Sequence, residues 1–167
     1  GVKENKAKLF ARKMDGSQEE IPVDLDENTM ISVIGKDVEG NLLLGLVTYD
    51  QIGGMESKPQ NAAIRKISAD GTVLQDIDTG KTMIKDDGFY MQGLLQDKDG
   101  NYYVCLQNSI YVVKQDGQPY CEIDVGTYIG SMFDVKGEKV LVSYFGEMTY
   151  ELQEVDLAGK RLKALDT

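Results

Sequence analysis

The stretch DKDGNYYVC, residues 97–105, carries the residue types of a calcium loop. Asp97, Asp99 and Asn101 offer oxygen ligands on alternate positions around Gly100. An EF-hand loop needs oxygen ligands at positions 1, 3 and 5, glycine at position 6 and glutamate at position 12. With Gly100 at position 6, the first and last positions are leucines, so the pattern indicates a hairpin turn. We therefore predict no metal site.

Two other motifs also fail as sites. DTGKT, residues 78–82, resembles part of a phosphate-binding loop, but Gln75 stands where the first glycine is required and no helix is expected to follow. Cys105 and Cys121 are the only cysteines, and we expect them on strands separated by a third strand. That spacing is too wide for a disulfide, so two largely buried free thiols are predicted.

The composition excludes several classes of function. The 167 residues contain no histidine, which removes the usual general base and metal ligand, and no tryptophan. The net charge of −10 disfavours nucleic acid as a partner. No apolar run is long enough to cross a membrane, and no signal peptide is visible. Paired carboxylates for glycoside hydrolysis stay an alternative, although 28 acidic residues make any pair uninformative. We predict no catalytic activity and no cofactor.

The elements that would position any site repeat along the chain. Three segments align on one glycine and each has an aspartate three residues before it: they begin at Ile31, Met91 and Tyr128. A second type of segment alternates with them, around Gly16, Gly71, Gly117 and Gly159. Asp-Gly between β-rich runs favours a hairpin, and type I′ turns require the positive φ that glycine supplies. Fourteen strands and almost no helix are predicted.

Two consecutive hairpins make a four-stranded antiparallel meander with the size of a propeller blade. We predict an all-β fold, a partial β-propeller of about three and a half blades in one domain, residues 1–167. The half-blade covers residues 8–25, and the whole blades cover 30–79, 90–125 and 128–166. Because the chain starts and ends on outer strands, we expect a fragment of a longer protein or an open arc. Self-association through a terminal blade face or the first edge strand is expected.

The repeat of hydrophobic run, DxDGN, YYVCLQ and IYVVKQDGQPYCEI resembles bacterial β-propeller repeats of the NHL, PQQ-like and two-component-regulator types. The acidic, histidine-free blades are also similar to the propeller-like region of some Gram-positive solute-binding lipoproteins. The second resemblance implies an extracellular or cell-surface location. The total number of blades does not follow from either.

Two connectors break the rhythm of the repeat. One is TYDQIGGMESKPQNA, residues 48–62, and the other is TGKTMIKDDGF, residues 79–89. In a propeller both emerge on the same face, and long loops on a rigid scaffold are where function concentrates. A tolerated insertion is the alternative for residues 51–60. The candidate ligand-binding residues are Tyr49, Asp50, Gln51, Lys81, Lys85, Asp86 and Phe89.

The sequence thus predicts a non-catalytic binding or scaffold module that presents a loop-rich face to a protein or carbohydrate partner. Part of a carboxylate-dependent glycosidase or lyase is the first alternative. The sensory propeller of a membrane receptor is the second.

Overall fold

The structure, a computed structural model, describes residues 5–137, 139–146, 149–156 and 161–164. In this part of the chain there are fourteen strands and no helix. The strands form one two-stranded and three four-stranded sheets, all with antiparallel pairing. The prediction of an all-β chain built from hairpins is therefore confirmed for these residues.

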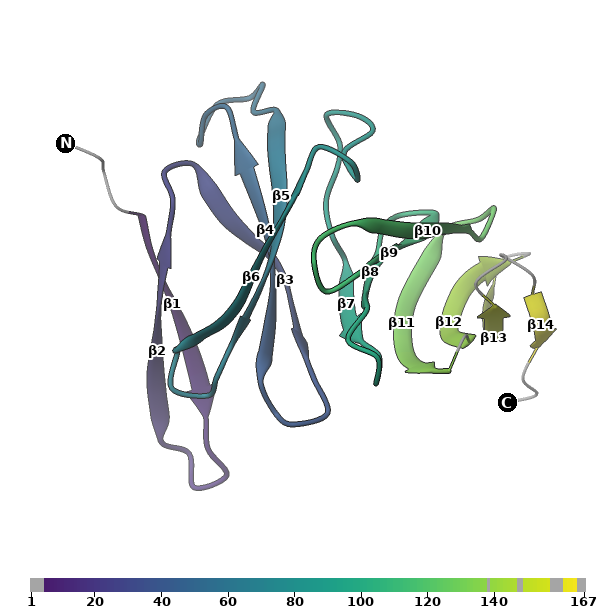
Figure 1. The fold of residues 1–167 in the computed structure, drawn as a ribbon, viewed down its shortest axis with the longest axis horizontal. Coiled ribbons are helices and arrows are strands. Elements are labelled where there is room, and N and C mark those ends of the chain that lie inside the picture. The colour runs from purple at the N-terminus through teal and green to yellow at the C-terminus, as the bar shows by residue number, and fades with distance from the viewer. Residues whose placement is uncertain (1–4, 138, 147–148, 157–160, 165–167) are drawn as a thin grey trace.

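Every sheet follows the chain order, with each strand paired to the next (Figure 1). The first sheet contains β1 (Asn5–Arg12) and β2 (Gln18–Leu25). The second contains β3 (Thr29–Lys36), β4 (Leu42–Tyr49), β5 (Pro59–Ile67) and β6 (Val73–Gly80). The third contains β7 (Gly93–Gln96), β8 (Tyr102–Cys105), β9 (Ser109–Val113) and β10 (Pro119–Asp124). The fourth contains β11 (Ile129–Lys136), β12 (Lys139–Gly146), β13 (Thr149–Asp156) and β14 (Arg161–Ala164).

The four sheets stand in a row, with the two-stranded sheet at one end and the fourth sheet at the other (Figure 1). β7, the first strand of the third sheet, contacts both β3 and β11, the first strands of the neighbouring sheets. Three apolar layers fill the spaces between successive sheets. The middle layer is the largest and includes Leu43, Ile64, Leu94, Tyr102 and Val104. Burial of these side chains holds the row together.

The hairpin turns have the glycine geometry that the sequence predicts, but a different turn type. Gly16, Gly40, Gly71, Gly100 and Gly117 all have φ between 86° and 93°. In each turn the residue three before the glycine accepts from the glycine N–H and donates its own N–H to the residue after the glycine. This is a three-residue loop closed by a left-handed glycine. Type I′ turns were the wrong prediction, because the residue before each glycine does not have positive φ.

The turn between β11 and β12 differs from the others. The register pairs Lys136 with Lys139 and Asp134 with Leu141, so Asp134 lies within the ladder. The aligned Asp37 and Asp97 instead begin their turns. The gap-free alignment of the three segments therefore overstates their likeness at this position.

Cys105 lies on β8 and Cys121 on β10, with β9 between them. Both are free thiols, Cys105 buried and Cys121 half-buried, which agrees with the prediction from strand order. Burial raises the pKa of Cys105 to about 11, so this thiol is protonated at neutral pH. Within the described residues no helix is long and apolar enough to cross a membrane.

Candidate functional site

The connections between strands separate into two sets, which lie at opposite ends of the strands because neighbouring strands are antiparallel. The turn end comprises the five glycine turns and Gly137. The loop end comprises residues 26–28, 50–58, 81–92, 106–108 and 125–128. The two long connectors belong to the loop end. They are residues 50–58 and 81–92, rather than the predicted 48–62 and 79–89, because β4, β5 and β6 extend further than expected and β7 begins later.

The two long connectors contact each other, as a common face requires. Lys58 Nζ of the first lies 3.7 Å from an Asp87 carboxylate oxygen of the second. Lys81 Nζ donates to the side-chain oxygen of Gln60 at 3.1 Å. The prediction that both connectors rise on the same side is confirmed by these contacts.

The connector 81–92 is held by its apolar residues. Met83, Phe89 and Met91 are buried in the middle apolar layer. The Met91 backbone N–H donates to the Ser32 hydroxyl at 3.0 Å, which ties the connector to β3. Gln92, the last residue of the connector, donates to the backbone oxygen of Ile129 on β11 at 2.6 Å, which ties the connector to the fourth sheet. The polar residues between Met83 and Phe89, which are Lys85, Asp86 and Asp87, are exposed.

A pocket of about 410 Å³ lies between the connector 81–92 and the loop end of the third sheet. Its apolar part consists of Met83, Phe89 and Leu106, of which Phe89 is 9% exposed and the others less. Its polar part comes from the connector, from the loop 106–108 and from β9 and β10. The register pairs Asp124 with Ser109, which places both at this end of their strands.

Glu122 is fixed inside the pocket by two partners. Lys85 of the connector forms a short ion pair with one of its carboxylate oxygens, and the Ser109 hydroxyl donates to the same oxygen at 2.8 Å. Burial alone would raise the pKa of Glu122, but Lys85 and Ser109 outweigh it and hold that pKa below its ordinary value. Glu122 is therefore ionised at neutral pH, and Lys85 neutralises it.

Two further carboxylates of the pocket remain open to a ligand. Asp86 Oδ1 accepts the Gly88 N–H at 2.8 Å, and Asp124 Oδ1 accepts the Gly126 N–H at 2.8 Å. In the part of the chain that the structure describes, neither Oδ2 has a hydrogen-bond partner. The side-chain amide of Asn108 is exposed beside them. The arrangement can both donate and accept hydrogen bonds at its rim.

The predicted site residues divide into two groups. Lys85, Asp86 and Phe89 line the pocket. The other four lie outside its lining: Tyr49 packs on the middle apolar layer, Asp50 accepts the Lys58 backbone N–H, Gln51 is exposed, and Lys81 binds Gln60. The predicted set is therefore not one cluster.

Sequence reasoning missed the half of the pocket that comes from the third sheet. These residues are Leu106, Gln107, Asn108, Ser109, Glu122 and Asp124, and Tyr90 of the connector 81–92 was missed with them. Asn108 and Asp124 lie in or beside connections of ordinary length for this repeat. An unusual loop length therefore could not mark them as site residues. Only the pairing of β9 with β10 brings them to the connector.

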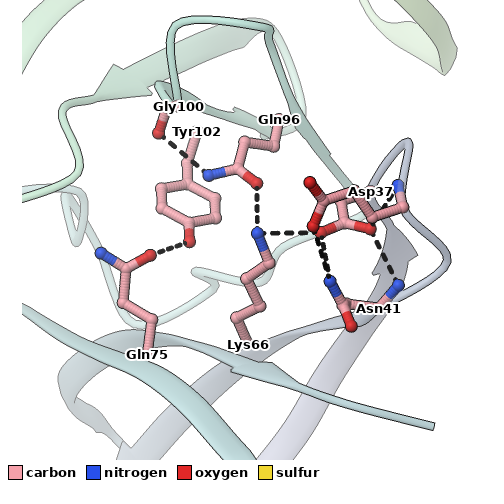
Figure 2. Close-up of polar contacts among 8 residues, drawn as sticks. Asp37, Asn41, Lys66, Gln75, Gln96, Gly100 and Tyr102 are labelled. Carbon is pink, nitrogen blue, oxygen red and sulfur yellow. Dashed lines mark hydrogen bonds and ion pairs between the residues drawn. The ribbon is translucent and has the colours of Figure 1, made fainter.

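A second polar cluster lies at the turn end, between the second and third sheets (Figure 2). Asp37 and Lys66 form an ion pair of 2.8 Å, with side chains 3% and 18% exposed. Lys66 also donates to Gln96 at 3.1 Å, and Tyr102 donates to Gln75 at 2.5 Å. Burial would raise the pKa of Asp37, yet hydrogen bonds from Lys66 and Asn41 lower it to about 2. The ion pair lies within the second sheet, and the hydrogen bonds from Lys66 to Gln96 and from Tyr102 to Gln75 join that sheet to the third.

The apparent calcium loop is one of these turns. Asp97 Oδ1 accepts the backbone N–H groups of Asp99 and Asn101, and Oδ2 accepts the Asn101 side-chain amide at 3.1 Å. The aspartate is therefore occupied by its own turn. Asp37 makes the same three contacts with Glu39 and Asn41, which explains why both segments share the pattern.

Comparison with known proteins yields a structural likeness and no family. No family model matches the sequence, and no curated protein matches it. The fold is similar to the crystal structure of a protein of unknown function from Bacteroides caccae, with a TM-score of 0.65 and 16% sequence identity. The likeness covers 92% of this chain and 52% of that one, so this chain spans about half the length of its structural neighbour. What is shared is the arrangement of the strands.

Proposed function

We propose that the chain is a segment of a β-propeller and acts as a non-catalytic binding module, whose loop end holds a protein or carbohydrate partner. The meander order of each four-stranded sheet and the contacts of β7 with β3 and β11 support the propeller. In that fold, first strands lie innermost around the axis. β1 and β2 then form half of a blade, and β1 offers an edge to another chain or to a further part of a longer protein.

The observation that carries the binding function is the meeting of the two longest connectors beside a pocket. Lys58 and Asp87 join the connectors, and Lys85, Asp86 and Phe89 of the second connector line the pocket. A pocket of about 410 Å³ has the size of small-ligand sites in proteins. Loops supported by a rigid sheet are a common place for such sites.

The electrostatics of the pocket favour binding over acid–base catalysis. A glycosidase needs a carboxylic acid with a raised pKa to protonate the leaving group. The pKa of Glu122, the carboxylate buried deepest among the three in the pocket, is lowered instead. Membership in a propeller-repeat family and an extracellular or cell-surface location stay predictions from the resemblance.

A matched pair of charge reversals tests which end binds. Asp86→Lys changes the pocket rim, whereas Asp99→Lys changes an exposed aspartate of the turn end. The labelled wild-type protein and both variants would be applied to arrays of glycans and of surface-protein fragments. We expect Asp86→Lys to lose the ligand that the wild type binds and Asp99→Lys to keep it. Retention by Asp86→Lys together with loss by Asp99→Lys would place the site at the turn end and refute the proposal.

A further inference from the structure

An exposed aromatic side chain lies on the rim of the pocket at the loop end. Tyr90 is 41% exposed, and its hydroxyl donates to Gln92 Oε1 at 3.4 Å. We propose that the pocket, with Tyr90 on its rim, binds a neutral oligosaccharide, an inference that rests on the proposed binding function of this end.

The apolar part of the pocket suits the C–H face of a sugar ring. Phe89 and Leu106 are 9% and 7% exposed and Met83 is 0% exposed, so the Tyr90 ring beside them, 41% exposed, supplies apolar surface that water leaves at a gain in free energy when a ligand covers it. A sugar ring presents C–H groups on its faces and hydroxyl groups around its edge. It can therefore cover this surface while its hydroxyls stay at the polar rim.

The rim matches hydroxyl groups because it mixes donors with acceptors. The Asn108 and Gln107 amides each carry both kinds of group. Asp86 and Asp124 each have one carboxylate oxygen that accepts a backbone N–H and one without a hydrogen-bond partner in the described part of the chain. Every sugar hydroxyl can donate to a carboxylate and accept from an amide, so neighbouring hydroxyls can satisfy the rim together.

Charge selects neutral sugars over acidic ones. The lining has three carboxylates and one lysine, and that lysine is already paired with Glu122. The remaining Asp86 and Asp124 repel a uronic acid, and the net charge of −10 adds to this repulsion at long range. A sugar without carboxylates avoids both penalties.

The exposed ring of Tyr90 extends the site beyond one sugar. A second sugar ring that leaves the pocket can stack on an aromatic surface at its mouth. Tyr90 stands at that position on the rim. In this chain without tryptophan, tyrosine is the side chain that can provide both stacking and a hydroxyl.

The test measures binding of disaccharides to the 167-residue chain by saturation-transfer NMR and calorimetry. The neutral probes are cellobiose, maltose and N,N′-diacetylchitobiose, and the acidic probe is digalacturonic acid. We expect at least one neutral disaccharide to bind in the millimolar range and the acidic one not to bind. Tyr90→Ala and Asn108→Ala should each weaken binding about tenfold. Phe10→Ala, which removes an exposed aromatic ring from β1, should leave binding unchanged.

The outcomes separate this inference from the function on which it rests. Absence of binding by every neutral disaccharide, equal binding of the acidic one, or an equal loss in Phe10→Ala overturns the oligosaccharide site. If Asp86→Lys then abolishes binding of a protein partner, the loop end is a protein-binding surface and the proposed function stands. If binding of no ligand depends on Asp86, both proposals fall. Asn108→Ala changes an exposed side chain, so its result does not depend on refolding of the core.

Discussion

Asp97 at the turn end and the two pocket aspartates at the loop end are used in different ways. At the turn end Asp97 accepts three hydrogen bonds with its two oxygens, all from its own turn. At the loop end, one carboxylate oxygen of Asp86 and one of Asp124 each accept a hydrogen bond from the backbone N–H two residues further along the chain. Their second oxygens have no hydrogen-bond partner in the described residues. Asp97 thus completes a turn with both oxygens, whereas Asp86 and Asp124 each offer one oxygen as an acceptor.

For Asp86 the length of its connection explains this difference. A three-residue turn closes two backbone hydrogen bonds and places the next side chains within reach of its aspartate. The connector 81–92 is too long to close in this way and is held by buried apolar residues instead. Its polar groups are therefore left for other partners. We expect changes at the turn end to cost stability and changes at the loop end to cost mainly binding.

The largest effect is expected where the second and third sheets approach most closely, next to the turn end. A Cβ atom added at Gly35 would lie 2.0 Å from the backbone oxygen of Leu94. Backbone atoms cannot move aside as a flexible side chain can, so Gly35→Ala forces β3 and β7 apart. We expect a loss of more than about 3 kcal/mol in the free energy of unfolding, measured in urea.

Gly16→Ala is the matched control for this substitution. Gly16 has φ of 86°, but an added Cβ would meet nothing within 4 Å. It therefore measures the cost of a left-handed alanine alone, about 1 kcal/mol. Equal losses in the two variants would show that the close approach of the sheets is unimportant.

The second effect separates the ion pair from the turn. Asp37 and Asp97 make equivalent contacts within their turns, but only Asp37 also pairs with a buried lysine. Asp37→Ala leaves Lys66 as a buried charge and should cost about 3 kcal/mol. Asp97→Ala loses only turn hydrogen bonds and should cost about 1 kcal/mol. Thermal and urea unfolding of both variants measure the difference, and similar costs would show that the ion pair adds nothing to the stability of the turn.

Acid should remove the contribution of Asp37 in a defined range of pH. Its pKa is lowered from 3.8 to about 2 in the folded chain. The ionised form therefore stabilises the fold above pH 3.8, and this stability is lost as the pH falls toward 2. The shift corresponds to about 2 kcal/mol. We expect the difference in unfolding free energy between wild type and Asp37→Asn to shrink across this range, and a constant difference would contradict the assignment.

The sequence predicts the hairpins well because their information is local. An Asp-Gly step between β-rich runs determines where the chain reverses, and the five glycine turns with positive φ occur where expected. Gly159 lies outside the described residues. The predicted turn type was wrong because each of these turns has three residues between the paired strands where a type I′ turn has two, and that number is not visible in the sequence alone.

The pocket and the Asp37–Lys66 ion pair could be predicted only in part because they join segments that lie far apart in the sequence. Length alone pointed to Lys85, Asp86 and Phe89. Glu122 faces Lys85 across a distance of 37 residues in the sequence. Asp37 meets Lys66 through the pairing of β4 with β5 beside the turn, and no repeat position indicates that partnership.

The smallest effect on stability is expected where the two long connectors meet. Lys58 and Asp87 are 54% and 71% exposed, so solvent screens their ion pair. Lys58→Ala should change the free energy of unfolding by less than about 0.5 kcal/mol. The same substitution removes the ion pair between the connector 50–58 and the connector that carries Lys85 and Asp86. Ligand binding at the pocket, measured by calorimetry, should therefore weaken although the free energy of unfolding changes little.

Lys13→Ala is the control. It removes an ion pair with Glu19 that is similarly exposed and lies at the turn end, and it should change neither ligand binding nor stability. A loss of stability in Lys58→Ala as large as that in Asp37→Ala would mean that the loop end also holds the fold, and the contrast between the two ends would fail.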